Sequence, residues 1–324
     1  MITQQHTTPI TLTHTINLLT DTVIDGSGMI ITAVRNEPVI TGNGVHSVVL
    51  KNITIHYDID EPLTHDAIKL DKCANITFEN PTIVAPEKGI LPKAINNTTA
   101  CAVRCDNCTD ITINNLYTQF GTDFTHVHPG TGETKKAYGN GVKFYQTDNS
   151  SISNSEINFC ATGVYCKHSD ELTINNNIIC EIYRWNPDEF GKGGCGILMS
   201  YGCSSTISDN RIYGCEEHGV YLSGGSDNHI IGNYIHENRG NGIQLNKGSY
   251  DDWLEVSYNI INNNTVNNNG MNGISLLRYA YNNVCNGNIC SGNIRKAIQQ
   301  SMGDSYFPRE EWSKGNRIGY NISK

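Results

Sequence analysis

The stretch GILMSYGCSSTISDNRIYGCEEHGVYLSGGSDNHIIGNYIHENRGNGIQL, residues 196–245, repeats one short pattern, and that pattern decides the fold. Each repeat opens with a glycine and an alternating apolar segment, as in Gly196 to Met199. It continues with a β-branched strand, an asparagine and a further apolar strand. The next repeats begin at Gly219 and Gly242, so the period is 23 residues. Such short alternating segments are typical of β-strands and exclude an amphipathic helix.

The same pattern extends outward through nearly the whole chain. Its basic spacing is 22 to 24 residues, and four repeats carry insertions. One turn per period would stack each strand on its equivalent about 4.8 Å away. The sequence therefore predicts an all-β parallel solenoid of about nine to ten coils with three sheets. The first strands are expected to be in register at Val45, Ile68, Val103, Val142, Val164, Ile197, Val220, Ile243, Ile274 and Ile298.

No linker divides the chain, so we expect a single β-helix domain over residues 1–324. Within it, residues 20–302 are predicted to form the coils. Residues 1–19 and 303–324 are predicted to form caps, because the open sheet edge at each end of a solenoid must be covered. Hydrophobic residues make up only 38% of the chain, which suits a thin core.

Apolar side chains are expected to align in columns inside the coils. One column on the last strand of each coil is predicted to contain Ile83, Leu116, Ile157, Ile178, Ile212, Ile235, Val266 and Ile289. Asparagine tolerates the left-handed conformation of a tight bend, and its amide can bond to the amides of neighbouring coils. A ladder is therefore predicted before that strand, formed by Asn114, Asn154, Asn177, Asn210, Asn233 and Asn263.

The coil repeat and its asparagine turn resemble the pectate-lyase-like (pectin-lyase-like) superfamily of right-handed parallel β-helices. The resemblance covers about residues 20 to 300 and implies a right-handed coil with substrate lying along the first sheet. A left-handed β-helix would need a six-residue periodicity, which the sequence lacks.

The charge and composition of the chain argue against some classes of binding partner. The net charge is −9, with 23 basic and 32 acidic residues, which argues against nucleic acid because that partner needs a basic field. No run of 18 apolar residues predicts a membrane span. Met1 to Thr20 lacks the features of a signal peptide. The protein is therefore expected to be cytoplasmic as synthesised, with association with a virion or release by lysis as alternatives.

Twelve cysteines raise the question of disulfides or metal. Several fall where the repeat needs a small buried apolar residue, a common role of free cysteine, so we expect mostly reduced thiols. The spacing of Cys101, Cys105 and Cys108 is compatible with metal ligands, but Cys105 occupies an inward position. We expect no cofactor, with a divalent cation such as calcium as the alternative.

The insertions favour one side of the solenoid as the binding face. Residues 84–100, 117–138 and 180–193 each precede a first strand, and residues 246–255 follow one. Loops gathered on one side of a solenoid commonly form its binding surface. The outward positions of the first strands carry several cations, which would attract an anionic ligand. The alternative is a solvated face on which these cations pair with Asp71 and Asp106.

A polysaccharide is the predicted partner of this face. The residues expected to bind it are Lys69, Arg104, Tyr165, Arg184, Trp185, Asp188, His218, Tyr221, Gln244 and Lys247. On an acidic polysaccharide, β-elimination or C5 epimerisation needs a cation that neutralises the uronate carboxylate, a base and an acid. The candidates for this chemistry are His126, His128, Tyr138, Lys143, Tyr145 and Lys167.

Two alternatives compete with a lyase or epimerase. The Asp-Pro-His run of alginate epimerases is absent, and His126-Val-His128-Pro129 is only the nearest stretch. A glycoside hydrolase needs two carboxylates, which Asp71 with Asp106, Asp188 with Glu189, or Glu216 with Glu217 would supply. The polygalacturonase signatures are missing. The other alternative is a non-catalytic viral or phage spike, or an adhesin-like solenoid, as a monomer or homotrimer.

Overall fold

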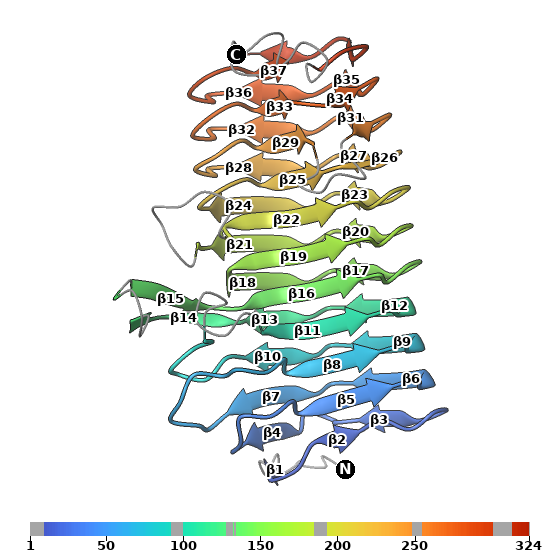
Figure 1. The fold of residues 1–324 in the computed structure, drawn as a ribbon, viewed down its shortest axis with the longest axis vertical. Helices are drawn as coiled ribbons and strands as arrows, with labels where there is room; N and C mark the ends of the chain where they lie inside the picture. The colour runs from blue at the N-terminus through green and yellow to red at the C-terminus, as the bar shows by residue number, and fades with distance from the viewer. Residues whose placement is uncertain are drawn as a thin grey trace, which may run out of the picture.

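The computed structural model describes residues 10–91, 100–127, 132, 134–184, 193–247, 255–300 and 313–323. These residues form a parallel β-helix in which three sheets run along the full height of the stack (Figure 1). Each coil contributes one strand to each sheet, and equivalent strands pair in parallel from coil to coil. The predicted fold class is confirmed.

The first sheet, made by the first strand of each coil, has eleven strands. They are β2 (Ile16–Asn17), β5 (Ile40–Asn43), β8 (Ile68–Asp71), β11 (Cys101–Asp106), β16 (Asn140–Tyr145), β19 (Thr162–Lys167), β22 (Cys195–Ser200), β25 (Val220–Ser223), β29 (Ile243–Asn246), β33 (Ile274–Leu276) and β37 (Ile298–Gln300).

The second sheet also has eleven strands. They are β3 (Val23–Asp25), β6 (His46–Lys51), β9 (Ala74–Glu79), β12 (Thr109–Asn114), β17 (Ser151–Ser153), β20 (Thr173–Asn175), β23 (Thr206–Ser208), β27 (His229–Ile231), β31 (Ile260–Asn262), β35 (Val284–Asn286) and β38 (Arg317–Ile318).

The third sheet has twelve strands. They are β1 (Ile10–Leu12), β4 (Ile30–Ala33), β7 (Thr54–Tyr57), β10 (Thr82–Val84), β13 (Tyr117–Gln119), β18 (Glu156–Cys160), β21 (Ile178–Ile182), β24 (Arg211–Cys215), β28 (Tyr234–His236), β32 (Thr265–Asn267), β36 (Ile289–Ser291) and β39 (Ile322–Ser323).

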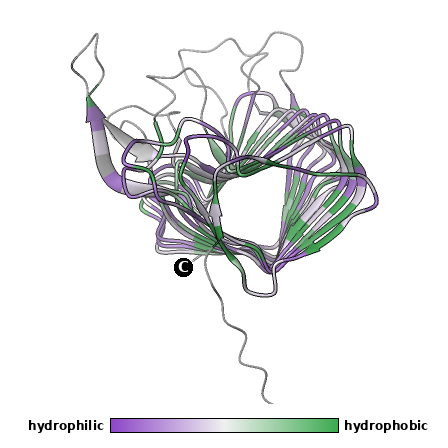
Figure 2. Ribbon diagram, turned by 90° about the horizontal axis from the view of Figure 1, so that it is seen from below, coloured by the Kyte–Doolittle hydropathy of each residue, from purple (hydrophilic) through white to green (hydrophobic). Residues whose placement is uncertain are grey.

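Two smaller sheets occur beside the three long ones. Strands β14 (Gly121–Val127) and β15 (Thr134–Tyr138) form an antiparallel hairpin inside the second predicted insertion. The hairpin projects sideways from the superimposed coils in the end-on view (Figure 2). The other small sheet is parallel and consists of β26 (Gly225–Ser226), β30 (Val256–Ser257) and β34 (Ala280–Tyr281).

The stack extends into both segments expected to form caps. Strand β1 pairs with β4, and β2 pairs with β5, before residue 19. At the other end, β38 and β39 pair with β35 and β36. A capping role for the chain ends stays a prediction. No helix in the described part of the chain has the length and apolar character needed to span a bilayer.

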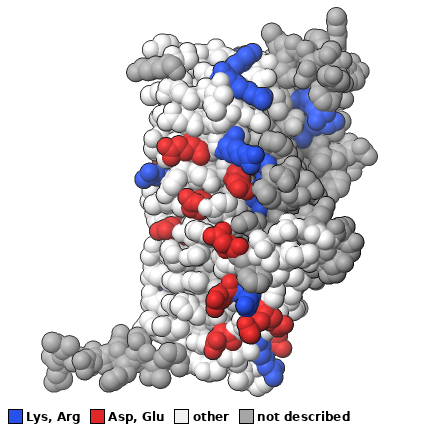
Figure 3. Space-filling model, turned by 90° about the vertical axis from the view of Figure 1, so that its left-hand side faces the viewer, with Lys and Arg blue, Asp and Glu red and all other residues white. Residues whose placement is uncertain are grey.

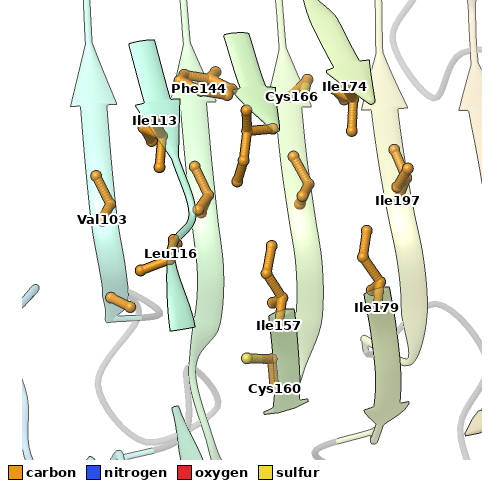
Figure 4. Packing of buried hydrophobic residues seen from close by; sticks show 14 of the residues in the cluster. Val103, Ile113, Leu116, Phe144, Ile157, Cys160, Cys166, Ile174, Ile179 and Ile197 are labelled. Atoms are coloured by element: carbon orange, nitrogen blue, oxygen red, sulfur yellow. The ribbon is translucent and has the colours of Figure 1, made fainter. Parts of the chain in front are cut away.

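Side chains from the three sheets meet inside the coils, where Val103, Phe144 and Ile157 are fully buried (Figure 4). The predicted first-strand register holds from Ile68 to Ile298. Val45 was misplaced, because Ile40 is the residue that pairs with Ile68. The glycine before Val45 has a positive φ of 66° and belongs to the turn after β5, so the Gly-Val pair there does not start a strand. All twelve cysteines are free.

The inward column predicted for the last strand of each coil was wrong at three of its positions. In register with Ile83, Ile157 and Ile212 lie Thr118, Ile179 and Cys290. Leu116 precedes its strand, whereas Ile178 and Ile289 point outward and are 41% and 38% exposed. At Ile178 and Ile289 an apolar residue also follows directly, so the pattern alone does not say which one faces the core. In the third case the inward residue is Thr118, which the apolar pattern does not mark.

An asparagine ladder runs along the turn before the third sheet. Asn233 Nδ2 donates to Asn264 Oδ1 at 2.9 Å, and Asn233 Oδ1 accepts from Asn210 Nδ2 at 3.0 Å. The predicted members Asn177, Asn210 and Asn233 are confirmed, but Asn264 replaces Asn263. Asn114 and Asn154 instead form a separate ladder with Asn176 at exposed positions. Consecutive asparagines made the buried position ambiguous at residues 262–264, whereas Ser155 and Leu116 occupy that position in the two earlier coils.

Candidate functional site

The outward face of the first sheet carries two polar columns, as predicted. Register places Lys69, Arg104, Lys143 and Tyr165 side by side on β8, β11, β16 and β19. Two residues further along the same strands lies the second column, made of Asp71, Asp106, Tyr145 and Lys167. Neighbouring members are one strand spacing apart, about 4.8 Å, so the face presents a continuous polar patch.

Lys143 is at the centre of this patch. Its ammonium lies 5.5 Å from the ring centroid of Tyr145 and 5.6 Å from that of Tyr165, within the range of cation–π attraction. Burial, and then the positive charge of Arg104, lower the pKa of Lys143, while nearby acidic groups and the Cys101 thiol oppose the shift. Among the described residues no carboxylate forms an ion pair with it.

Arg104 is held by two carboxylates of the protein. Its Nε lies 2.7 Å from Asp106 Oδ2, and its Nη1 lies 3.7 Å from Asp66 Oδ2. Asp66 Oδ1 also accepts a 2.8 Å hydrogen bond from the backbone N–H of Cys101. Burial raises the pKa of Asp66. The simple pairing that the sequence left open thus holds for Arg104 but not for Lys143.

Asp66 was not among the site residues predicted from the sequence. It lies two residues before Ile68, at a coil position that other coils fill with Cys101, Asn140 or Thr162. The sequence signal that could have identified Asp66 is a carboxylate at a position where the other coils have small, weakly polar residues. Asp106 Oδ1 is buried and has no hydrogen-bond partner among the described residues. Such an unsatisfied buried acceptor is costly, and a ligand donor would satisfy it.

Two other predicted residues lie on the hairpin. Tyr138 is buried, donates a 3.0 Å hydrogen bond to Asp123 and stacks on Tyr183 at 5.0 Å. Burial raises its pKa. His126 lies on β14 opposite Lys135, and burial lowers its pKa.

Further along the stack, His218 and Arg184 are buried rather than displayed on the surface. His218 Nδ1 accepts a 3.0 Å hydrogen bond from the backbone N–H of Asn241, and its ring meets that of Tyr221 edge-on at 5.5 Å. The backbone N–H of Arg184 donates to Glu216 at 2.7 Å. This side of the first sheet is a packed polar region.

The pKa of His218 falls to about 3 because burial, and then the Arg184 charge, disfavour the imidazolium. The unfolded chain binds this proton near pH 6.5, whereas the folded chain binds it only near pH 3. Between these values protonation favours the unfolded chain, so stability that is present above pH 6.5 is lost as pH falls toward 3. The loss should approach about 1.4 kcal/mol per pH unit. Urea unfolding at pH 7 and pH 5 should show a steeper loss for the wild type than for His218→Gln. Equal losses would contradict this origin.

Gln244 and Lys247 complete the predicted binding set that the structure describes. Gln244 is buried, and its Oε1 accepts a 2.6 Å hydrogen bond from Asn241, so its amide is engaged within the protein. Lys247 Nζ lies 5.6 Å from the ring of Tyr279. His128, Trp185 and Asp188 lie outside the described residues. Within the described residues no group of three or more His, Cys, Asp or Glu side chains is arranged to hold a metal ion.

A family model described as a right-handed β-helix region matches residues 140–310. SHC SH2 domain-binding protein 1 of Mus musculus is 28% identical over 143 residues, which cover 38% of this chain and 20% of that protein. The match thus spans about a fifth of the length of this curated relative. Nothing about the whole relative follows for this chain.

Two solved structures are similar over almost the whole chain. The A-module of the Azotobacter vinelandii mannuronan C-5 epimerase AlgE4 has a TM-score of 0.61 and 12% identity, covering 98% of this chain and 86% of that one. The Dettilon tailspike protein has a TM-score of 0.54 and 18% identity, covering 97% of this chain and 55% of that one. Identities this low support a common fold alone.

Proposed function

The chain belongs to the right-handed β-helix family, and from that premise we propose that it acts on an acidic polysaccharide along the first sheet, by β-elimination or C5 epimerisation. The observation that carries the proposal is Lys143, which is partly buried between two tyrosine rings, next to Arg104 and without an acidic partner among the described residues. The similarity to a mannuronan C-5 epimerase is consistent with this substrate class.

The roles follow from charge and proton affinity. Lys167 neutralises the uronate carboxylate, which makes the C5 proton removable. Arg104, although it pairs with Asp66 and Asp106, adds positive charge beside it. Lys143, with its lowered pKa, takes that proton as a neutral amine. In β-elimination the C4–O bond then breaks, a C4–C5 double bond forms, and Tyr145 protonates the leaving oxygen. In epimerisation a proton returns to C5 from the opposite face.

The test is a panel of alginate, pectate, glucuronan and chondroitin. New ultraviolet absorbance from the conjugated double bond identifies a lyase. Exchange of the C5 hydrogen in D₂O without that absorbance identifies an epimerase. If no polysaccharide in the panel gives either signal, the proposal fails for these sugars.

The pH dependence gives a sharper prediction. Activity should rise with pH as Lys143 loses its proton, with the rising limb below the ordinary lysine value of 10.5. Because the Arg104 charge helps to lower this pKa, Arg104→Gln should move the limb to higher pH, besides weakening substrate binding. Profiles of kcat against pH for the two proteins measure the shift. A limb that stays in place would argue for a different base.

Asp66 and Asp106 support a second candidate, a glycoside hydrolase. Hydrolysis pairs one carboxyl kept protonated by a raised pKa with one ionised carboxylate. Burial raises the pKa of Asp66, and both acids contact Arg104. New reducing ends without ultraviolet absorbance, abolished in Asp66→Asn, would favour this function. Binding without any product would favour a non-catalytic spike.

A further inference from the structure

We propose that the outward face of the third sheet is a two-fold interface between two copies of this chain. The inference does not depend on the proposed function, because it concerns a different sheet. It begins with one column of outward residues in register on seven successive strands. This column, the third-sheet column, reads Thr82, Tyr117, Glu156, Ile178, Arg211, Tyr234 and Thr265.

The third-sheet column exposes apolar side chains in the middle of the solenoid. Tyr117, Ile178 and Tyr234 are 36%, 41% and 42% exposed. Much of this flank is uncharged, and its acidic and basic side chains gather in a band that runs along the height of the stack (Figure 3). Exposed apolar residues that are scattered singly over a surface are normal, whereas apolar residues gathered on one face indicate an interaction surface.

The order of residues in the column is self-complementary about Ile178. A two-fold axis parallel to the strands reverses the stacking direction of the second copy and keeps the column facing itself. Ile178 then meets Ile178 of the other copy, and Tyr117 meets Tyr234. Thr82 likewise meets Thr265. An isologous interface requires this reciprocity, in which residue i contacts j and j contacts i.

The charges fit the same axis. Glu156 of each copy faces Arg211 of the other, which gives two ion pairs. Within one chain, Ile178 separates these residues, and no ion pair of either is recorded among the described residues. Glu156 accepts a 3.0 Å hydrogen bond from Asn158. The Arg211 guanidinium lies 4.8 Å from the ring of Tyr213. Both charges thus stay near the face on which a partner would meet them.

The size of the face sets the expected strength. Seven strands spaced about 4.8 Å apart span roughly 29 Å, and the strands are short. The buried area is therefore below that of a standard interface, about 1,600 Å² in total. We expect a reversible dimer whose population rises with concentration, in which the patch around Lys143 remains on a different sheet.

Charge reversal tests the interface. Glu156→Arg or Arg211→Glu alone places two like-charged pairs across the axis, and each should weaken dimerisation at least about tenfold. The double variant exchanges the charges and should restore dimerisation to within about threefold of the wild type. Sedimentation velocity over a concentration series measures all four proteins. A monomeric wild type at the highest concentration, or a double variant as weak as the singles, overturns the proposal.

Cross-linking tests the position of the axis independently. Ile178→Cys should give a disulfide-linked dimer under mild oxidation, because this residue lies on the axis. Thr82→Cys should not, since its counterpart is Thr265, but Thr82→Cys combined with Thr265→Cys should. The wild type is the background control for the native thiols. Cross-linking of Thr82→Cys alone, or none with Ile178→Cys, overturns this arrangement.

Discussion

Replacing Lys143 with methionine should lower the rate on the acidic polysaccharide by about 10²–10⁴-fold, the range for losing a positioned base. Methionine keeps much of the length of the side chain that packs between Tyr145 and Tyr165, so the coil should stay folded. The amine is what disappears. Initial rates from the ultraviolet or C5-exchange assay, with circular dichroism as a check of fold, measure the effect.

One further variant distinguishes a base from a neutralising cation at Lys143, and a second variant serves as the control. Lys143→Arg keeps a positive charge but cannot act as a neutral base, because arginine stays protonated in proteins. It should therefore be nearly as inactive as Lys143→Met if the residue is the base, and substantially active if it only neutralises the carboxylate. Lys51→Met is the matched control, since Lys51 lies on the second sheet and pairs with Glu79 at 2.8 Å. Full activity of Lys143→Met would remove this residue from the mechanism.

The coil register was predictable because several sequence features in each coil specify the same alignment. From Val142 to Ile274 each first strand repeats an apolar residue after a glycine, and the next apolar residue follows two positions later. A slip by one residue would turn the whole set outward. Where apolar or amide residues stand next to each other, as at Ile178 and Ile179, the period permits either alignment, and the prediction failed there.

The candidate site was predictable only where it lies on the coils. The neighbourhood of Arg104, Lys143 and Tyr165 follows from the register alone. The insertions have no equivalent in other coils, so nothing in the repeat fixes how they fold. For this reason the repeat does not predict that Tyr138 at the end of the hairpin stacks on Tyr183, which follows β21. Asp66 was missed because its partner Arg104 lies in the next coil, across an insertion.

Asn233→Ala should lower the free energy of unfolding by about 2–4 kcal/mol, because several buried polar groups lose partners together. Asn233 Oδ1 accepts from the backbone N–H of Asn210 at 3.0 Å, and Asn233 Nδ2 donates to the carbonyl of Ile207 at 2.9 Å. Alanine replaces neither bond. Asn233→Asp should be at least as damaging, since it removes the donor and buries a charge.

The ladder also explains why one residue should have so large an effect. Each coil contacts only its neighbours, so a break in the middle of the stack weakens the interface between two halves. Asn175→Ala is the matched control, because Asn175 ends β20 at a partly exposed position. Its change should stay within about 0.5 kcal/mol. Urea unfolding of the three variants measures the differences. If Asn233→Ala lowered the free energy of unfolding no more than Asn175→Ala, the buried amides would not contribute to stability. The stack would then be stabilised by its apolar columns alone.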